Sequence, residues 1–252
     1  MERCGIGYAS IVILRIRAYL EKFNYIHHHK GSNMIRLHGF PYSNYYNIVK
    51  HTLMLKDIPF EEHIVYPGTA ELKQLSPAGK VPAMTTESGT VLSESSVLVD
   101  FLEDAYPEKP LYPADAEARA KVRQIMKLSE LYLELPARRL LPAVLAKLEI
   151  AKTTLDEVRA TLERGVAALD SLARFSPYVA GEELTLADVY LRYSLAIPKM
   201  VGPSQMDWDI VASVNGLAQW DTMMADSDIS RKVDADMRDN LEEFMGYIAS
   251  RK

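Results

Sequence analysis

The chain has 252 residues, of which 48% are hydrophobic and 25% are charged, and its formal net charge is -5 at pH 7. This composition is typical of a soluble globular protein with one large domain or two small ones, and the absence of a Lys/Arg block argues against a nucleic-acid-binding protein. No apolar run in the sequence approaches the ~20 residues that span a bilayer, so no membrane association is expected. Cys4 is the only cysteine, which excludes an internal disulfide and a cysteine-based zinc site.

Residues 1–33 differ from the rest of the chain, and we expect them to be a dispensable leader. The stretch "YASIVILRIRAYL" is apolar only briefly before two arginines interrupt it, whereas a secretory signal has a longer apolar segment and a small-residue cleavage site. An arginine-bearing organelle presequence is the alternative. The run "HHHK" at 27–30 is either a weak metal binder or the remnant of an expression tag. Organised structure is predicted to begin at Met34.

The pattern of residues 34–107 predicts the order β-α-β-α-β-β-α. Alternating apolar residues predict strands at 34–40 and 58–65, and helical spacing predicts helices at 43–57 and 68–75. The stretches "VPAMTT" and "TVLSE" flank the turn Glu87-Ser88-Gly89 and read as a hairpin, after which a helix begins near Glu94.

Residues 105–113 hold three prolines and are expected to break the structure as a linker. After this linker only helices are predicted, at 114–135, 155–172, 183–197, 213–225 and 237–250. Thr185 and Asp188 have the spacing of a helix capping box, which is a folding element. The expected fold class is α+β, with a small α/β domain at 34–107, a linker at 108–113 and an all-helical domain at 114–252.

Two short stretches of the first domain have features of a binding site. In "GKVPAM", 79–84, a cis Val81-Pro82 bond would turn the backbone N–H and C=O of Val81 toward a peptide-like ligand, although a trans edge proline is the more frequent alternative. In "ESSVLVDFLE", Glu94 and Ser95 open a helix whose free N–H groups and dipole favour an anion. Ser95 can bind a carboxylate there and Glu94 an ammonium group; simple helix capping is the alternative.

The chain from about 34 to 250 resembles the cytosolic glutathione transferases, of a serine-type, bacterial-like kind. Four stretches carry the resemblance: "LHGFPYSNYYNIVKHTLMLKDIPFE" at 37–61, "SPAGKVPAM" at 76–84, "LSESSVLVDFLEDAYP" at 92–107 and "SPYVAGEELTLADVYL" at 176–191. The resemblance implies an N-terminal thioredoxin-like domain, a C-terminal helical bundle, glutathione as co-substrate and no metal.

The same resemblance implies roles for individual residues. Pro82 would follow a cis bond, Val81 would pair with the cysteinyl backbone of glutathione, and Glu94 and Ser95 would hold its γ-glutamyl head. Lys80 would pair with the glycyl carboxylate, unless it is an ordinary solvated lysine.

The hydroxyl that activates the glutathione thiol is expected between the first strand and the first helix. Ser43 matches the position at which serine-type members carry this hydroxyl, although proline often comes next in the family and Asn44 stands here. Tyr42, Asn44 and Tyr45 are alternative donors, and a simple helix cap is the alternative role for Ser43. A mechanism through a protein cysteine is not expected, because no cysteine follows Cys4.

The second substrate is expected to lie against the helical domain. By analogy with the family, Tyr132, Arg138 and Arg139 face that region, although such residues more often form a solvated surface. The expected function is conjugation of glutathione to a hydrophobic electrophile by a cytoplasmic homodimer that serves detoxification. The alternatives are dehalogenation, peroxide reduction or isomerisation on the same fold, and a non-catalytic interaction module. The serine-rich loop with Cys and Trp of maleylacetoacetate isomerases is missing.

Overall fold

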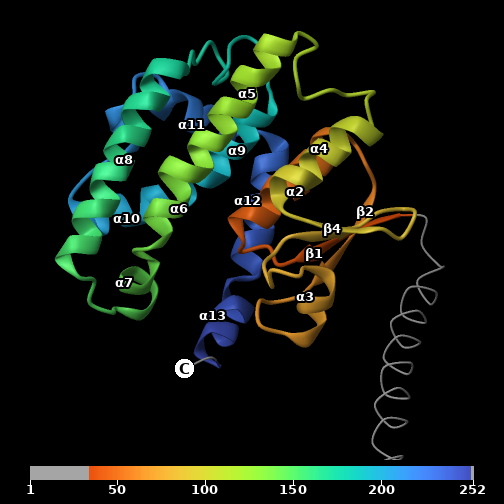
Figure 1. The fold of residues 1–252 in the computed structure, drawn as a ribbon, viewed down its shortest axis with the longest axis horizontal. Coiled ribbons are helices and arrows are strands. Elements are labelled where there is room, and N and C mark those ends of the chain that lie inside the picture. The colour runs from red at the N-terminus through yellow and green to blue at the C-terminus, as the bar shows by residue number, and fades with distance from the viewer. Residues whose placement is uncertain (1–33, 251–252) are drawn as a thin grey trace, which may run out of the picture.

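The computed structural model describes residues 34–250 (Figure 1). The expected leader, the "HHHK" run and Cys4 therefore lie outside the described residues. The first described strand starts at Ile35, and the expectation that organised structure begins at Met34 stays a prediction.

The first part of the chain forms a four-stranded mixed sheet in the order β2-β1-β3-β4. Strand β1 (Ile35–Gly39) pairs in parallel with β2 (Phe60–Ile64) and antiparallel with β3 (Ala83–Thr85), and β3 pairs antiparallel with β4 (Val91–Ser93). A parallel pair needs a crossover connection, which helix α2 (Asn44–Leu55) supplies. All four predicted strands are confirmed, each slightly shorter than its sequence pattern suggested.

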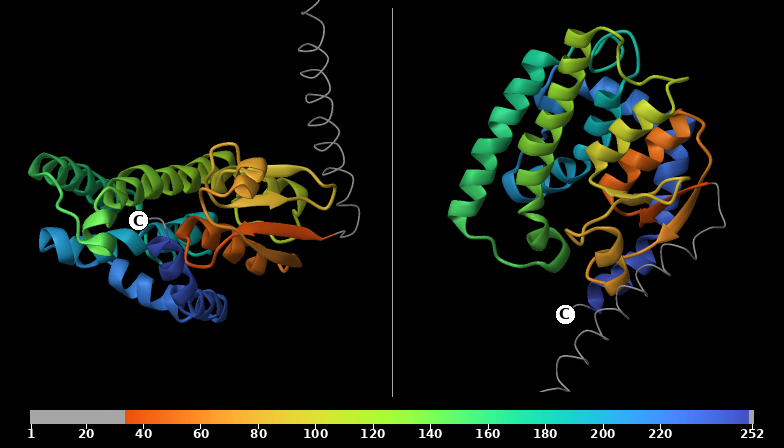
Figure 2. Two further views of the ribbon diagram at one scale, coloured as in Figure 1. Left: turned by 90° about the horizontal axis from the view of Figure 1, so that it is seen from below. Right: turned by 45° about the vertical axis from the view of Figure 1, so that its right-hand side comes forward.

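Helices cover both faces of this sheet. In Figures 1 and 2, α2 and α4 (Ser95–Ala105) lie on one face and α3 (Ala70–Leu75) on the other. The inner side chains of β1 and of α2 are fully buried together. Burial of this apolar face is what holds α2, and with it the loop that precedes α2, against the sheet.

In the rest of the described chain the regular elements are all helices, apart from one isolated bridge between Tyr178 and Gly181. Its elements are α5 (Ala116–Leu128), the π-helix η1 (Ser129–Glu134), α6 (Leu135–Arg138), α7 (Leu141–Ala146), α8 (Lys152–Leu172), α9 (Leu186–Ser194), α10 (Ala196–Met206), the 3-10 helix η2 (Val211–Ser213), α11 (Leu217–Ala225), α12 (Asp228–Asp239) and α13 (Leu241–Ala249). Residues 106–115 between α4 and α5 hold no helix or strand, and we propose the domain boundary there.

Several helix boundaries differ from the sequence prediction. The predicted helix at 114–135 is divided into α5, η1 and α6, because the hydrogen bonding changes to a π-helix at Ser129. The predicted helix at 237–250 is wrong as a single unit, since Asn240 ends α12 and α13 follows.

Three helices were missed from the sequence, namely the short α7 and the longer α10 and α12. The middle of α10 contains Gly202 and Pro203, both poor helix formers. α12 is so polar that its apolar face is narrow, although Ser227 caps its start. In both α10 and α12, packing against the rest of the protein outweighs the weak helix preference of the local sequence.

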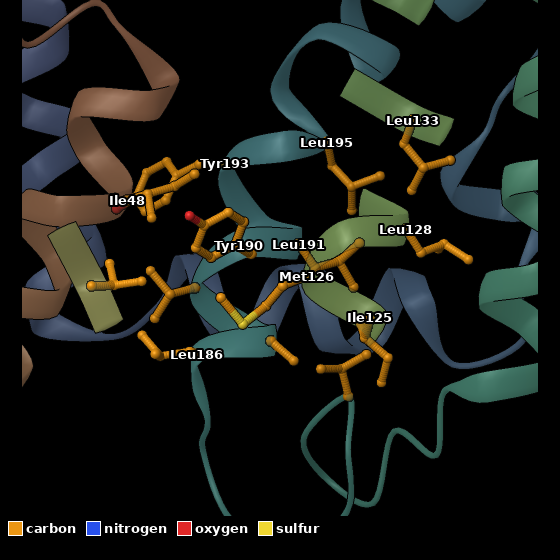
Figure 3. Close-up of a cluster of buried hydrophobic side chains, with 14 of the residues drawn as sticks. Ile48, Ile125, Met126, Leu128, Leu133, Leu186, Tyr190, Leu191, Tyr193 and Leu195 are labelled. Atoms are coloured by element: carbon orange, nitrogen blue, oxygen red, sulfur yellow. The ribbon is translucent and has the colours of Figure 1, made fainter. Parts of the chain in front are cut away.

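Helix α9 lies at the centre of the molecule and joins the two parts. Its predicted capping box is present, with reciprocal hydrogen bonds between Thr185 and Asp188. The fully buried Asp188 carboxylate also accepts hydrogen bonds from the backbone of Val179 and from the indole of Trp220. Figure 3 shows the apolar side chains of α9 between those of α2 and those of α5. The sheet part and the helical part therefore share one continuous core.

Candidate functional site

Ser43 lies in the loop between β1 and α2 and caps the first turn of α2. Its backbone is extended (φ -86°, ψ 118°), and its Oγ accepts a long hydrogen bond of 3.4 Å from the backbone N–H of Tyr46. Among the described residues, no group accepts a hydrogen bond from the Ser43 hydroxyl. A half-buried hydroxyl with a free hydrogen at a helix N-terminus is well arranged to donate to an anion, which the helix dipole also favours.

The peptide bond between Val81 and Pro82 is cis, as the family resemblance implies, so the trans alternative is wrong. The bond leads directly into β3. Within residues 34–250, neither the N–H nor the C=O of Val81 has a hydrogen-bond partner. The neighbouring Lys80 side chain is exposed and forms no ion pair with the described residues. This segment therefore offers a backbone donor, a backbone acceptor and a cation to a ligand.

Glu94 and Ser95 lie where β4 passes into α4. Glu94 has a positive backbone φ (φ 72°, ψ 115°), its side chain is exposed, and it makes no capping hydrogen bond. Positive φ at a residue other than glycine is uncommon and tends to occur at functional sites. The buried Ser95 hydroxyl accepts a hydrogen bond of 3.2 Å from Tyr190 of α9. Burial raises the pKa of Tyr190, so its hydroxyl stays a neutral donor.

These residues line one cavity of about 400 Å³ between the sheet part and the helical part. Its lining consists of Phe40, Ser43, Tyr45, Pro67, Lys80, Val81, Pro82, Glu94, Ser95, Glu130, Leu135 and Arg138. A larger open depression of about 830 Å³ lies where the start of α5 meets the end of α8, but it contains none of the expected site residues. The smaller cavity is the better candidate, because a free hydroxyl, a free backbone pair and two helix N-termini converge there.

Two of the alternative thiol activators have their donor hydrogens committed elsewhere. The Asn44 amide donates to Glu134 at 3.0 Å and to the carbonyl oxygen of Tyr193 at 3.3 Å. The Tyr45 hydroxyl donates to Glu134 at 2.8 Å. Burial, reinforced by the charge of Glu134, raises the pKa of Tyr45 and keeps it a neutral donor to that carboxylate. None of these three hydrogens is free for a thiolate.

The third alternative, Tyr42, is not part of the cavity lining. Its ring stacks on Phe244 of α13 with 4.5 Å between ring centroids, and its backbone N–H donates to Asn240 at 3.3 Å. Ser43 is therefore the hydroxyl of this loop that both lines the cavity and keeps a free hydrogen.

The helical part contributes a different set of residues from the one the sequence suggested. Of the three expected residues, only Arg138 lines the cavity. Arg139 instead pairs with Glu157 of α8 at 2.9 Å, and Tyr132 is an exposed side chain outside the lining. Glu130 and Leu135 also line the cavity and were missed. No pattern in the sequence of 114–135 sets them apart from the other residues of an amphipathic helix.

Within the described residues there is no cluster of three or more His, Cys, Asp or Glu side chains that could hold a metal ion. No described helix combines the length and the apolar character needed to cross a membrane.

Comparison with known proteins shows the family of the chain. A family model described as the glutathione S-transferase N-terminal domain matches residues 37–110. A glutathione S-transferase of Pseudomonas putida is 40% identical over 220 residues, which cover 87% of this chain and 100% of the relative. The chain belongs to the glutathione S-transferase family. A maleylpyruvate isomerase of Ralstonia sp. is a more distant relative of this family member, 29% identical over 168 residues that cover 62% of this chain and 79% of the isomerase.

Solved structures confirm the expected glutathione transferase fold. A glutathione transferase of Phanerochaete chrysosporium, crystallised with oxidised glutathione, superposes with a TM-score of 0.72 at 16% identity, covering 84% of this chain and 99% of that chain. At this level of identity the likeness concerns the fold. The expected arrangement of a thioredoxin-like domain followed by a helical domain is therefore correct.

Proposed function

We propose that this family member binds glutathione in the 400 Å³ cavity, stabilises its thiolate and conjugates it to an electrophilic small molecule. The observation that carries the proposal is the convergence on one cavity of the free Ser43 hydroxyl, the unpaired Val81 backbone and the helix start at Glu94 and Ser95. These groups match the three chemical features of glutathione: a thiol, a peptide backbone and a charged γ-glutamyl head.

Each feature of glutathione has a partner in this proposal. The γ-glutamyl carboxylate accepts from the N–H and hydroxyl of Ser95 at the start of α4, and the ammonium group pairs with Glu94. The cysteinyl backbone forms two hydrogen bonds with Val81, and Lys80 pairs with the glycyl carboxylate.

The thiol then lies at the start of α2, where Ser43 stabilises its ionised form. A free thiol has a pKa of about 8.5, so only a few per cent is thiolate near neutral pH. Lowering this pKa by ~2 requires roughly 2.7 kcal/mol of preferential stabilisation of the thiolate. One hydroxyl hydrogen bond to the anion and the N-terminal dipole of α2 together supply that amount.

The chemical step follows from the position of the sulfur. The thiolate lone pair forms a carbon–sulfur bond with an electrophilic carbon; a leaving group departs with its electron pair, or an enone takes up a proton. Leu135, Phe40 and Pro67 give the cavity an apolar side for a hydrophobic electrophile. We further propose that the enzyme works as a cytoplasmic homodimer in detoxification.

The relatives suggest a second candidate within the same chemistry. The maleylpyruvate isomerase is similar over much of the chain, and isomerisation also begins with attack by a glutathione thiolate on an unsaturated carbon. Dehalogenation and peroxide reduction remain alternatives of the same kind.

Binding to immobilised glutathione, followed by a screen with halides, epoxides, enones and peroxides, tests the proposal. We expect retention on the resin, elution by free glutathione and turnover of at least one electrophile class. Net conversion without a stable conjugate would favour isomerisation. Failure to bind glutathione would overturn the proposal and favour a non-catalytic interaction module.

A further inference from the structure

Glu134 is a charged side chain of the helical part that the proposed mechanism leaves unused. It closes the π-helix η1, and no part of it is exposed to solvent. Burying a carboxylate is costly unless other groups satisfy it, so its partners identify what it does.

The partners of Glu134 lie on both sides of the boundary between the two parts. From its own part, Arg138 donates to Oε1 through Nε at 2.8 Å and also through Nη2. From α2, Asn44 donates to Oε1 at 3.0 Å and Tyr45 donates to Oε2 at 2.8 Å. Both carboxylate oxygens are therefore occupied, and two of the four contacts come from the first two residues of α2.

Arg138 contacts the same two residues of α2 as Glu134 does. Its Nη2 also donates to Oδ1 of Asn44 at 2.8 Å, and its guanidinium lies 5.6 Å from the centre of the Tyr45 ring. The second hydrogen of the Asn44 amide is held by the Tyr193 carbonyl at 3.3 Å. Every polar group of the Asn44 side chain is thus bound by residues of the helical part.

These contacts lie next to Ser43, which makes only a weak hydrogen bond of its own. Ser43 precedes Asn44, and its own capping bond to α2 is long at 3.4 Å. We propose that Glu134 is a positioning residue, which fixes the first turn of α2 from the helical part and so directs the Ser43 hydroxyl and the free N–H groups of α2 at the glutathione sulfur. This inference rests on the proposed function.

The charges of the pair distinguish positioning from a direct electrostatic effect. Glu134 and Arg138 compensate each other, so the network adds little net charge beside the sulfur. Replacing Glu134 by Gln would leave the Arg138 cation uncompensated, and a direct electrostatic effect would then favour the thiolate and lower the thiol pKa. Loss of positioning would instead raise the thiol pKa, because the hydrogen bond from Ser43 to the thiolate would weaken.

The experiment measures the pKa of bound glutathione from the ultraviolet absorbance of its thiolate in Glu134→Gln. The matched control is Glu157→Gln, which breaks the exposed ion pair to Arg139 on the neighbouring surface. We expect Glu134→Gln to raise the thiol pKa by about 0.5–1 and, if the wild-type pKa is about 6.5, to lower turnover at pH 7 by about 1.5- to threefold. Turnover should recover in alkaline buffer, the glutathione Kd should change by less than about twofold, and the control should match the wild type.

Tyr45→Phe provides a second test if Glu134→Gln does not fold, because it removes one hydrogen bond and keeps the ion pair of Glu134 and Arg138. We expect it to raise the thiol pKa as well, and we expect most of either shift to vanish in a Ser43→Ala background, since both residues act through Ser43. A shift that persists in that background would overturn the inference.

An unchanged or lowered thiol pKa in Glu134→Gln would also overturn it. Failure of the proposed function itself gives a different result. In that case the wild-type complex shows no depressed thiol pKa, or Ser43→Ala leaves the pKa unchanged.

Discussion

Replacing Ser43 by Ala removes one oxygen from the cavity and leaves the α2 backbone donors in place. Within the described residues the lost oxygen has one recorded partner, the 3.4 Å hydrogen bond from the Tyr46 N–H. A cap this long lies at the weak end of the usual range, so we expect a loss of stability of about 0.5–1 kcal/mol. The enzyme should therefore stay folded.

The effect on the bound thiol should be larger. A hydrogen bond to a charged group is worth ~1.5–3 kcal/mol, which corresponds to a rise of about 1–2 in the thiol pKa. If the wild-type pKa is about 6.5, the thiolate fraction at pH 7 falls from about three-quarters to between about a quarter and 3%. Turnover at pH 7 should fall by about three- to 25-fold and should return near pH 9.

Titrating the thiolate absorbance of the binary complex against pH measures this shift directly. The glutathione Kd, measured beside it, should stay within about threefold of the wild-type value, because the contacts to the peptide and the γ-glutamyl head are unchanged. A Ser43→Ala titration curve that overlays the wild type would refute the reasoning. Ser43 would then be only a helix cap, and Asn44, Tyr45 or Tyr42 would be the activating group.

Three further predictions concern binding, the N-terminus and pH. Glu94→Ala combined with Ser95→Ala should weaken glutathione binding at least tenfold, since charge-assisted contacts are worth ~1.5–3 kcal/mol; unchanged calorimetric affinity would exclude this placement of the γ-glutamyl head. A chain that begins at Met34 should keep its Tm and its glutathione affinity, and a loss of several degrees would contradict the idea of a dispensable leader. Burial, together with the charge of Arg192, lowers the pKa of His51 to about 3, so the unfolded state takes up a proton below pH ~6.5 that the folded state does not, and stability falls as pH falls. The free energy of unfolding should fall by about 2 kcal/mol between pH 6.5 and pH 5. Urea denaturation at several pH values should show a weaker dependence of this free energy on pH in His51→Gln. An equal dependence in both proteins would show that His51 does not cause the loss of stability.

The parts of the site that follow from local sequence were predictable. Ser43 caps a helix directly after a strand, and Glu94 and Ser95 open the helix after a short hairpin. Val81 precedes a proline at the start of a strand, where a ladder hydrogen bond is not needed. In each case residues within a few positions along the chain determine the backbone geometry of the site residue. A short stretch of sequence is therefore enough to predict it.

Glu134 was not predictable in this way. A glutamate in a helical stretch is read as a solvated residue, because charged side chains are almost never fully buried unless they are paired. Here the buried residues Leu128 and Ser129 are followed five positions later by the buried Leu133 and Glu134, a spacing that fits the i→i+5 pattern of the π-helix rather than the 3.6-residue period. The π-turn directs Glu134 inward, and its partners on α2 lie about ninety positions earlier in the chain.

The two proposed ends of the glutathione site share a dependence on the helical part. At one end, Tyr190 of α9 holds the Ser95 hydroxyl at the start of α4. At the other end, Glu134 of η1 holds the first residues of α2, beside Ser43. α9 and η1 pack against each other and against α5 within the common core. The groups that would bind the γ-glutamyl head and ionise the thiol thus stand at helix starts of the thioredoxin-like part, while the hydrogen bonds that orient them come from helices of the helical part that pack together. Such an arrangement fixes the separation of the two helix N-termini, which a tripeptide spanning both requires.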